Sequence, residues 1–503
     1  MNDFAVLPKR FTEQTQLFIG GTWVAPQSGE RQAVLNPATE EVIGEAPVGG
    51  LPEAEAALAA AREAFDRGPW PTMSPAERAG FVRRMHAALL ARADRIKELQ
   101  IVEAGATRAL AETMMFASPM KIVETAIERS LNQAARHLPI ATALNPFDPA
   151  GAQLIGSGVV VREAIGVVSA ITPFNAPFLT NLAKVFPALL AGNTVVLKPS
   201  PHTPFSALLF GEAAREAGLP RGVLNIVTGN ADVAQMMTAD PRVDMVTFTG
   251  SEQVGAAILA QGAPTIKKTL LELGGKSALI VREDADVQKA AMEGVFQVST
   301  HCGQGCALAT RHIVHNAIRP AYVETMCAIV QQLSVGNPAA PGTVVGPLIR
   351  EASRSRVERF VQQGRDEGAR LVAGGRRPAH LDKGFFYDVT IFDDVTNDMS
   401  IAQEEIFGPV ASVLGFDTDE EAVQIANDSR YGLYGGIHSR DPAKAYEMAL
   451  RLRTGGVVIN GGLYALMDAP FGGYKRSGLG REFGPNWLSE YTQEKSVLFR
   501  IGI

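Results

Sequence analysis

Short apolar runs alternate with alanine-rich amphipathic stretches through the middle of the chain. From about Val159, β-type runs such as AIGVVSAITPFN, NTVVLKPS and VDMVTFTG alternate with helical stretches such as PFSALLFGEAAREAG. Strands and helices in strict alternation are typical of parallel sheets that are joined by right-handed crossovers and covered by helices on both faces. The pattern predicts an α/β fold of the nucleotide-binding type.

A second set of such runs follows. It starts with KSALIV, the helix ADVQKAAMEGVFQVST and the strand RHIVH, and later includes VASVLGF and GGVVIN. The N-terminal region reads instead as short strands, followed by helices from about Pro52 to His137. With 503 residues, the chain is long enough for about two to four domains. We therefore predict two α/β domains packed together, since no low-complexity linker separates them.

Charge and cysteine content narrow the function classes. The net charge is −6, and no block of lysine and arginine suggests binding to nucleic acid. The first residues lack the apolar core of a secretion signal, and the apolar run GVVVREAIGVVSAITPF is interrupted by charged residues and a proline. We expect no membrane association and a cytoplasmic location. Three cysteines, Cys302, Cys306 and Cys327, are then expected to be free thiols.

Two of these cysteines lie in the glycine-rich stretch STHCGQGCALATR. A zinc site would combine Cys302 and Cys306 with His312 and His315, but these histidines flank the strand HIV, where neighbouring side chains point to opposite faces. We therefore expect no metal, and a disulfide is disfavoured in a reducing compartment. A thiol nucleophile requires an exposed loop and a helix end or donors that lower the thiolate pKa from about 8.5. A glycine-flanked cysteine between two helical stretches can supply both.

The stretch VTFTGSEQVG offers a phosphate-binding turn. A strand leads to Gly250 and Ser251, and Gly255 lies within the next helix. A glycine at a strand-to-helix turn allows the backbone to approach a pyrophosphate beside the helix N-terminus. An ordinary turn remains an alternative, because G-S-x-x-x-G departs from the dinucleotide fingerprint. Lys198 follows the strand VVL, at the end where parallel strands meet ligands, although a lysine there can also be simply solvated.

Two further residues are candidates for acid–base and oxyanion chemistry. Glu272 lies between two leucines in LELGGKS, and an apolar setting raises a carboxyl pKa toward the range useful for a general base. The alternative is an exposed glutamate on a strand edge. Asn175 lies between Pro173 and Pro177, where a rigidly held amide can donate to an oxyanion, or can be a turn residue.

Taken together, seven motifs resemble the aldehyde dehydrogenase superfamily over nearly the whole chain: TPFNAP, VVLKPS, FTGSEQVG, LELGGKS, GQGC, EEIFGPV and PFGGYKRSGLGRE. The resemblance implies two Rossmann-like parallel-sheet domains. We predict an NAD(P)-binding domain at 1–139 and 160–273, and a catalytic domain at 274–475. It also implies a small β oligomerisation element at 140–159 and 486–503, whose exposed strand edges are expected to be covered in a homo-oligomer, either a dimer or a tetramer.

The resemblance also assigns roles to residues. The family's G-Q-x-C pattern places the nucleophile at Cys306 and leaves Cys302 as a bystander; the general base falls on Glu272 and the oxyanion donor on Asn175. NAD is the implied cofactor, and its contacts fall on Lys198 for the adenine ribose, Gly250 and Ser251 for the pyrophosphate, Glu405 for the nicotinamide ribose, Phe407 beside the nicotinamide, and Thr172 and Pro173.

The implied reaction oxidises an aldehyde to its carboxylic acid. The cysteine forms a thiohemiacetal with the aldehyde, loss of hydride to the nicotinamide leaves a thioacyl enzyme, and the glutamate activates water for hydrolysis. Hydrolysis is favoured over transfer to coenzyme A because acyl-transferring relatives tend to lack this base. Many NAD-preferring relatives have a glutamate where this chain has Pro201, so NADP is an open alternative.

The expected substrate tunnel differs from that of acetaldehyde-type relatives. Small residues replace bulky ones at several positions, which predicts a wide, mostly apolar tunnel for an aromatic, terpenoid or medium-chain aldehyde. Its predicted lining is Phe178, Thr180, Ala183, Gly305, Ala307, Leu463 and Tyr464. Two alternatives remain: a semialdehyde or CoA-acylating relative, and a non-catalytic binding or structural protein on the same fold.

Overall fold

The computed structural model describes residues 15–132, 135–145, 147, 151, 153–461 and 468–501. Its first sheet has eight strands in the order β2-β1-β10-β9-β8-β11-β12-β22, with a parallel centre from β10 to β12 and antiparallel edges. The strands are β1 Leu17–Ile19, β2 Thr22–Val24, β8 Val167–Ile171, β9 Thr194–Lys198, β10 Leu224–Ile226, β11 Met245–Thr249, β12 Lys268–Glu272 and β22 Gly478–Leu479.

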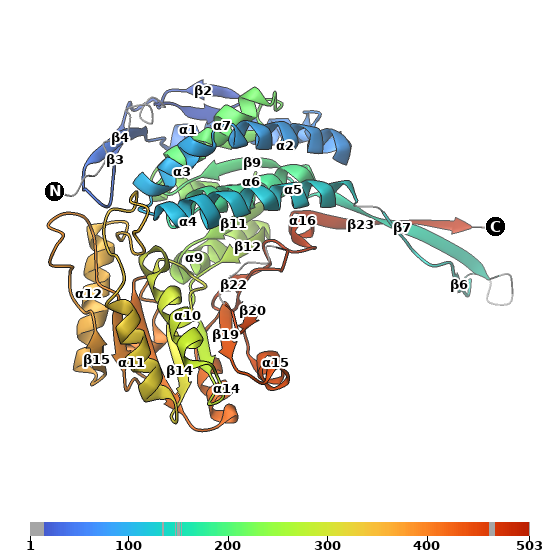
Figure 1. Ribbon diagram of the computed structural model, residues 1–503. Coiled ribbons are helices and arrows are strands. Elements are labelled where there is room, and N and C mark those ends of the chain that lie inside the picture. Colours follow the sequence, from blue (N-terminus) through green and yellow to red (C-terminus); the bar gives the residue numbers. More distant parts are fainter. Residues whose placement is uncertain are drawn as a thin grey trace.

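Helices cover both faces of this sheet (Figure 1). One face carries α2 Pro75–Leu90, α3 Ala93–Val102, α4 Arg108–Glu112, α5 Ser118–Leu131, α6 Pro177–Ala191 and α7 Phe205–Glu216. The other carries α1 Leu51–Asp66, α8 Ala231–Ala239 and α9 Glu252–Gly262. A π-helical turn, Thr113–Ala117, joins α4 to α5. The helices predicted from about Pro52 to His137 are present from Leu51 to Leu131, but the end of the prediction is wrong, because Arg136–His137 is a short strand.

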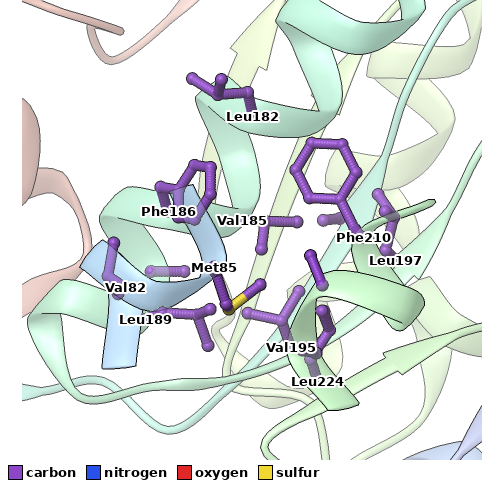
Figure 2. Packing of buried hydrophobic residues seen from close by; sticks show 14 of the residues in the cluster. Val82, Met85, Leu182, Val185, Phe186, Leu189, Val195, Leu197, Phe210 and Leu224 are labelled. Atoms are coloured by element: carbon purple, nitrogen blue, oxygen red, sulfur yellow. The ribbon is translucent and has the colours of Figure 1, made fainter. Parts of the chain in front are cut away.

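Helix α6 lies in the middle of the first core, and its position fixes the loop that carries Asn175. The helix starts at Pro177, whose ring suits the first helical position, and ends at Gly192, which adopts a left-handed φ of 96°. Its apolar side chains contact α2, α7 and the sheet from several sides (Figure 2). Figure 2 labels four side chains of α6, which are Leu182, Val185, Phe186 and Leu189. The labelled residues of the same cluster from other elements are Val82, Met85, Val195, Leu197, Phe210 and Leu224.

The second sheet has seven strands in the order β15-β16-β17-β14-β13-β19-β20, and all neighbours are parallel except the edge pair β15–β16. The strands are β13 Ala278–Val281, β14 Arg311–His315, β15 Arg370–Ala373, β16 Thr390–Asp393, β17 Val410–Phe416, β19 Tyr434–His438 and β20 Gly456–Ile459. Helices again lie on both faces: α10 Val287–Ser299, α11 Arg319–Val330, α12 Glu351–Asp366 and α13 Ser400–Gln403 on one, and α14 Asp419–Asn427 and α15 Pro442–Arg451 on the other.

A β arm projects from the body (Figure 1). In it, β7 Leu154–Ala164 pairs antiparallel with β23 Thr492–Ile501, and the short strands β5 Arg136–His137 and β6 Ala141–Ala143 also pair with β7. These strands extend beyond the predicted oligomerisation segments, since β5 precedes residue 140 and β7 continues past residue 159. The small helix α16 Trp487–Glu490 lies within the predicted segment but contacts α6.

The remaining elements are two small antiparallel pairs, β3 Arg31–Leu35 with β4 Val42–Pro47 and β18 Tyr431–Gly432 with β21 Tyr474–Lys475. The predicted α/β class and the two parallel sheets are confirmed. The exact domain boundaries stay a prediction. Within the described part of the chain, no helix has the length and apolar character that crossing a membrane requires.

Candidate active site

The carboxyl ends of the strands in the first sheet face the loop that carries the cysteines. Strand β12 ends at Glu272, which is paired in register with Thr249 at the end of β11. The loop before α6 brings Asn175, and the loop after α10 brings Cys306. These three side chains line one cavity of about 180 Å³. The structure therefore brings the three predicted catalytic residues together.

Glu272 is a buried carboxylate that lacks hydrogen-bond partners. It is 1% exposed, and neither carboxylate oxygen has a partner within the described residues. Burial and the nearby Glu482 carboxylate raise its pKa well above the usual value, against the opposing effects of Lys184 and Arg481. An exposed glutamate on a strand edge was the alternative, and the structure excludes it. Such a carboxyl can act as a proton acceptor near neutral pH.

A buried ion pair lies beside Glu272, and the sequence analysis missed it. Lys184 Nζ lies 2.7 Å from Glu482 Oε1 and 3.2 Å from Thr247 Oγ1, and Lys184 is fully buried. A lysine in the apolar helix segment NLAKVFPALL was the available signal, because a buried lysine is almost always paired. The pair places a positive charge next to Glu272 without forming a hydrogen bond to it.

Asn175 is held by the backbone of the cysteine loop. Its Nδ2 donates to the carbonyl oxygen of Gln304 at 2.9 Å, which leaves one amide hydrogen for another acceptor. The Gln304 side chain is itself fixed, because Nε2 donates to the carbonyls of His301 and Pro347, and Oε1 accepts from the N–H of Ile349. The glutamine of the GQGC motif thus anchors the loop on which Asn175 depends.

The surroundings of Cys306 disfavour its thiolate. Burial, Glu405 and Glu272 together raise its pKa to about 12. The expectation of a loop that lowers the thiolate pKa is therefore wrong. The loop follows the carboxyl end of α10, whose partial charge is negative, and two carboxylates lie nearby. Cys306 is only partly exposed, whereas Cys302 is fully buried in the core of the second domain.

The alternative metal site is not assembled by the described residues. His312 and Tyr322 bond to each other at 3.0 Å, and the second ring nitrogen of His312 contacts the carbonyl oxygen of Ala309 at 3.0 Å. Across the described ranges, no group of three or more histidine, cysteine or acidic side chains is arranged to hold a metal ion. The three cysteines are free thiols.

The Gly-Gly pair after Glu272 is required by close contacts with the second domain. A Cβ added at Gly275 would lie 2.2 Å from the carbonyl oxygen of Cys306, and one at Gly274 would lie 2.6 Å from Glu405 Oε2. The N–H of Gly275 also donates to Glu405 Oε1 at 3.0 Å. The pair therefore lets the end of β12 approach both Cys306 and Glu405.

Lys198 and the first turn of α9 fit a dinucleotide. Lys198 is buried rather than solvated, and burial lowers its pKa to about 8, although Asp232 opposes this effect. Its Nζ lies 3.5 Å from the carbonyl oxygen of Pro199, and ribose hydroxyls can provide further acceptors for the ammonium. Gly250 lies at the turn between β11 and α9, and Ser251 caps the helix by accepting from the N–H of Val254.

The other predicted cofactor residues lie around the same edge of the sheet. Thr172 donates through Oγ1 to Asn181 at 2.6 Å and precedes the half-buried Pro173. Burial raises the pKa of Glu405 to about 7, while Arg356 and Lys276 act in the opposite direction. Phe407 adopts a left-handed φ of 58°, and its ring centroid lies 5.9 Å from that of Phe174 in an edge-to-face contact.

The cavity walls agree with the predicted tunnel at four positions: Thr180, Ala183, Gly305 and Ala307. Phe178 does not line the cavity. It faces the core, where its ring contacts Phe116 and Phe210, because it lies two positions from Thr180 and therefore on nearly the opposite side of α6. Leu463 and Tyr464 lie outside the described residues. Sequence reasoning missed eight apolar or aromatic wall residues: Leu110, Met114, Met115, Leu179, Leu308, Tyr434, Phe471 and Phe483.

Comparison with known proteins identifies the family. The model of the aldehyde dehydrogenase family matches residues 23–497. The chain belongs to this family. The predicted enzyme class, an oxidoreductase acting on aldehydes with a nicotinamide cofactor, is thereby confirmed.

Three relatives of this aldehyde dehydrogenase are informative. The betaine aldehyde dehydrogenase of Bacillus subtilis (strain 168) is 37% identical over 490 residues, 96% of each chain. The peroxisomal aminoaldehyde dehydrogenase 1 of Pisum sativum is 36% identical over 96% of this chain and 95% of its own. A crystal structure of a Mycobacterium tuberculosis aldehyde dehydrogenase complexed with NAD+ has a TM-score of 0.91 and 41% identity, covering 98% of this chain and 99% of its own.

A substitution at Gly275 tests the contact between the two domains of this aldehyde dehydrogenase. Gly275→Ala is expected to displace the backbone at Cys306, because the added Cβ would overlap its carbonyl oxygen. A misplacement of about 1 Å can cost roughly 100-fold in rate, so we expect a loss of that order in kcat/KM. The measurement is the initial rate of NADH formation at saturating NAD, with the aldehyde concentration varied through its KM. Gly342→Ala is the control, since nothing lies within 4 Å of its added Cβ; equal activity of the two variants would contradict the contact.

Proposed function

We propose that this aldehyde dehydrogenase oxidises a bulky, apolar aldehyde to the carboxylic acid through a thioacyl intermediate on Cys306. The observation that carries the proposal is the shared cavity: it joins the thiol of Cys306, the unpaired carboxylate of Glu272 and the amide of Asn175 to walls that are mostly aliphatic and aromatic. A non-catalytic protein on this fold would have no need to keep these three groups in one place.

In the first step, the sulfur of Cys306 bonds to the aldehyde carbon. Its thiol is neutral at rest, so the proton must move to a base, and Glu272 is the carboxylate without hydrogen bonds in the same cavity. The free amide hydrogen of Asn175 and the backbone N–H of Cys306 then stabilise the oxyanion. Fixed donors cost no reorganisation when the negative charge develops.

NAD, when bound, supplies the hydride acceptor. We propose that Lys198, the first turn of α9 and Glu405 hold it, as set out for each residue above. Asp232 supports a preference for NAD over NADP: it acts electrostatically on Lys198, and a carboxylate there would repel a 2′-phosphate even though Pro201 replaces the expected glutamate.

Before the last step, Glu272 releases to solvent the proton that it took from Cys306. Glu272 then takes a proton from water, and the resulting hydroxide displaces the Cys306 thiolate from the acyl group. The raised pKa of Glu272 suits this role, because a general base works best when its pKa is near the operating pH. We therefore propose hydrolysis rather than transfer to coenzyme A. A semialdehyde substrate has no support, since the described residues that line the cavity include no lysine or arginine.

The substrate class is argued from the walls of the cavity. Leu110, Met114, Met115, Leu179 and Leu308 all line the cavity. Aliphatic and thioether groups favour a neutral apolar chain through burial of its surface. Two relatives are instead named for other substrates, betaine aldehyde and aminoaldehydes.

A cationic aldehyde is therefore the second candidate. Tyr434 and Phe471 line the cavity with ring centroids 6.1 Å apart, and aromatic faces attract quaternary ammonium groups. Against it, the carboxylate of Glu482 in the cavity wall is already paired with Lys184.

A panel of aldehydes decides between the two substrate classes. Octanal, benzaldehyde and citral are each compared with betaine aldehyde, 3-aminopropanal and acetaldehyde, using NAD and NADP in parallel. We expect kcat/KM to be at least about tenfold higher for the apolar group, which corresponds to roughly 1.4 kcal/mol of transition-state binding. A higher kcat/KM for betaine aldehyde or 3-aminopropanal would show that the substrate is cationic and not apolar. A kcat/KM for acetaldehyde equal to that for the apolar aldehydes would refute the wide cavity.

Glu272→Gln separates acylation from deacylation. Glutamine keeps the shape but cannot take a proton, so turnover is expected to fall by roughly 10²–10⁴ while one equivalent of NADH still forms in a burst. In the parent enzyme, the deacylation rate should fall as pH drops below the raised pKa of Glu272, because only the deprotonated form is a base. In the Glu272→Gln variant, the deacylation rate should no longer fall in this way as the pH drops.

Cysteine variants provide the controls for the burst. Cys306→Ala should show no burst and no acyl mass on the peptide that carries position 306, whereas the buried Cys302→Ala should keep both. An unchanged steady-state rate of Glu272→Gln, or a burst that depends on Cys302, would contradict the assigned roles.

We propose that the β arm mediates assembly into a homo-oligomer. Leu498 and Phe499 of β23 are 70% and 50% exposed, and the arm projects from the body (Figure 1). Exposed apolar strands are normally covered by a partner. Leu498→Asp/Phe499→Asp should lower the mass measured by analytical ultracentrifugation at micromolar concentration, and an unchanged mass would contradict the role of the arm.

We also propose a cytoplasmic location, which the three free thiols support.

A further inference from the structure

The peptide groups of Ala309, three residues after Cys306, are both held by buried side chains. Its N–H donates to Gln297 Oε1 at 3.1 Å, and its carbonyl oxygen lies 3.0 Å from His312 Nε2. Gln297 belongs to α10 and His312 to β14, the elements on either side of the cysteine loop. The loop is therefore clamped at its exit by the two elements that enter and leave it.

Tyr322 of α11 completes the arrangement. Its hydroxyl lies 3.0 Å from His312 Nδ1, and both residues are fully buried. The carbonyl oxygen of Ala309 can only accept, so His312 must carry its proton on Nε2, and the tyrosine hydroxyl must donate to Nδ1. Burial lowers the pKa of His312 to about 4, which agrees with a neutral ring. Tyr322 thus selects the tautomer that can hold Ala309.

The neighbouring residues of α10 fit around this network. A Cβ added at Gly294 would lie 2.3 Å from the Tyr322 hydroxyl, so glycine leaves the room that the tyrosine occupies. Gln297 Nε2 donates to Glu293 Oε1 at 2.6 Å, which directs the other end of the amide, Oε1, toward Ala309. Each polar atom of the glutamine amide therefore has a defined partner.

We propose that Gln297 and His312 are positioning residues that act through Ala309 on Cys306, and that Tyr322 supports them. This inference rests on the proposed function, in which Cys306 is the nucleophile. The clamp fixes the backbone between the nucleophile and β14, and so the direction of the sulfur and of the Cys306 N–H. None of the three side chains needs to touch substrate or cofactor.

The two bonds to Ala309 anchor the loop exit together with the bond that the Thr310 carbonyl oxygen accepts from the Ser412 N–H at 2.9 Å. Gly305 and Leu308 form a weak turn contact of 3.4 Å, whereas the bonds to Ala309 are 3.0 and 3.1 Å long and shielded from water. A displacement of about 1 Å at a reacting atom can lower a rate roughly 100-fold. Loss of either clamp bond should therefore reduce kcat more than it affects cofactor binding.

The experiment compares three substitutions in the full-length enzyme. Gln297→Met keeps the length of the side chain but removes the acceptor, His312→Leu removes the donor, and Tyr322→Phe deletes only one oxygen atom. Active sites are counted by mass spectrometry of the peptide that carries Cys306 after alkylation with iodoacetamide. kcat per active site, KM for NAD and the alkylation rate of Cys306 are measured for each variant, together with its melting temperature.

We expect kcat per active site to fall by at least about tenfold for Gln297→Met and His312→Leu, and by about threefold for Tyr322→Phe, with KM for NAD within about twofold of the parent value. The alkylation rate of Cys306 should change in the same variants. A fall in kcat of less than about threefold for both Gln297→Met and His312→Leu overturns the proposal, whatever happens to the melting temperature.

Two further variants separate positioning from general stability. Asn427→Leu removes an amide that also holds two backbone groups, the N–H of Arg453 and the carbonyl oxygen of Arg451, at the end of α14. It should lower the melting temperature and leave kcat per active site unchanged. The exchange Gln297→Glu/Glu293→Gln keeps an acceptor for Ala309 and an amide partner beside it, so it should recover most of the kcat that Gln297→Met loses.

The proposed function can fail independently of this inference. A parent enzyme that forms no NADH from any aldehyde refutes the function, while the alkylation rates still report on the clamp. If Gln297→Met or His312→Leu does not fold, Tyr322→Phe and the Gln297→Glu/Glu293→Gln exchange decide: an unchanged kcat per active site in Tyr322→Phe together with a loss in the exchange variant overturns the proposal.

Discussion

The close approach of Gly275 to the carbonyl oxygen of Cys306 is the constraint on which the site depends. It brings the end of the first sheet into backbone contact with a loop of the second domain, at a distance that no side chain tolerates. Glu272 lies three residues earlier on the same segment, and the Gly275 N–H holds Glu405. One turn of backbone therefore sets the distance between the base, the nucleophile and a predicted cofactor residue.

The same approach explains the electrostatics. Where the two domains meet, Glu272 is buried and its carboxylate oxygens have no hydrogen-bond partner among the described residues, and burial with the nearby carboxylates raises the pKa of Cys306. Lys184 lowers the pKa of Glu272 but its partner Glu482 raises it, so the buried pair as a whole does not favour the ionised form of Glu272. The surroundings thus disfavour a preformed thiolate, and the proposed attack by Cys306 depends on transfer of its proton to the deprotonated form of Glu272.

Much of the fold was predictable from the sequence because the apolar runs mark the strands directly. VDMVTFTG and RHIVH correspond to β11 and β14, and the predicted turn at Gly250 lies between β11 and α9. The grouping of Cys306, Glu272 and Asn175 in one cavity was predicted from motifs. Sequence alone did not give the raised pKa of Cys306, since that depends on which carboxylates lie near it in space.

The parts that were missed depend on the three-dimensional arrangement of the chain. Some depend on which face of an element a residue occupies, and others on contacts between residues that are far apart in the sequence. Phe178 was assigned to the tunnel because it is large and close to Asn175, but the turn of α6 directs it into the core. The π-helical segment that carries Met114 and Met115 is far away in sequence and gave no signal that it would form a wall. Lys184 was visible as a charge in an apolar helix, yet its partner, Glu482, is 298 positions away.

The catalytic groups and the cavity walls come from different elements, and this separation bears on the substrate. Glu272 and Cys306 are fixed by the contact between the domains, whereas Leu110 and Met114 come from α4 and the turn after it, and Phe471 from the segment before β21. Wall residues can therefore change without disturbing the contact at Gly275. Relatives at 36–37% identity can then share the chemistry and differ in the aldehyde they accept, which is why the substrate must be argued from the walls of this cavity and not from the names of its relatives.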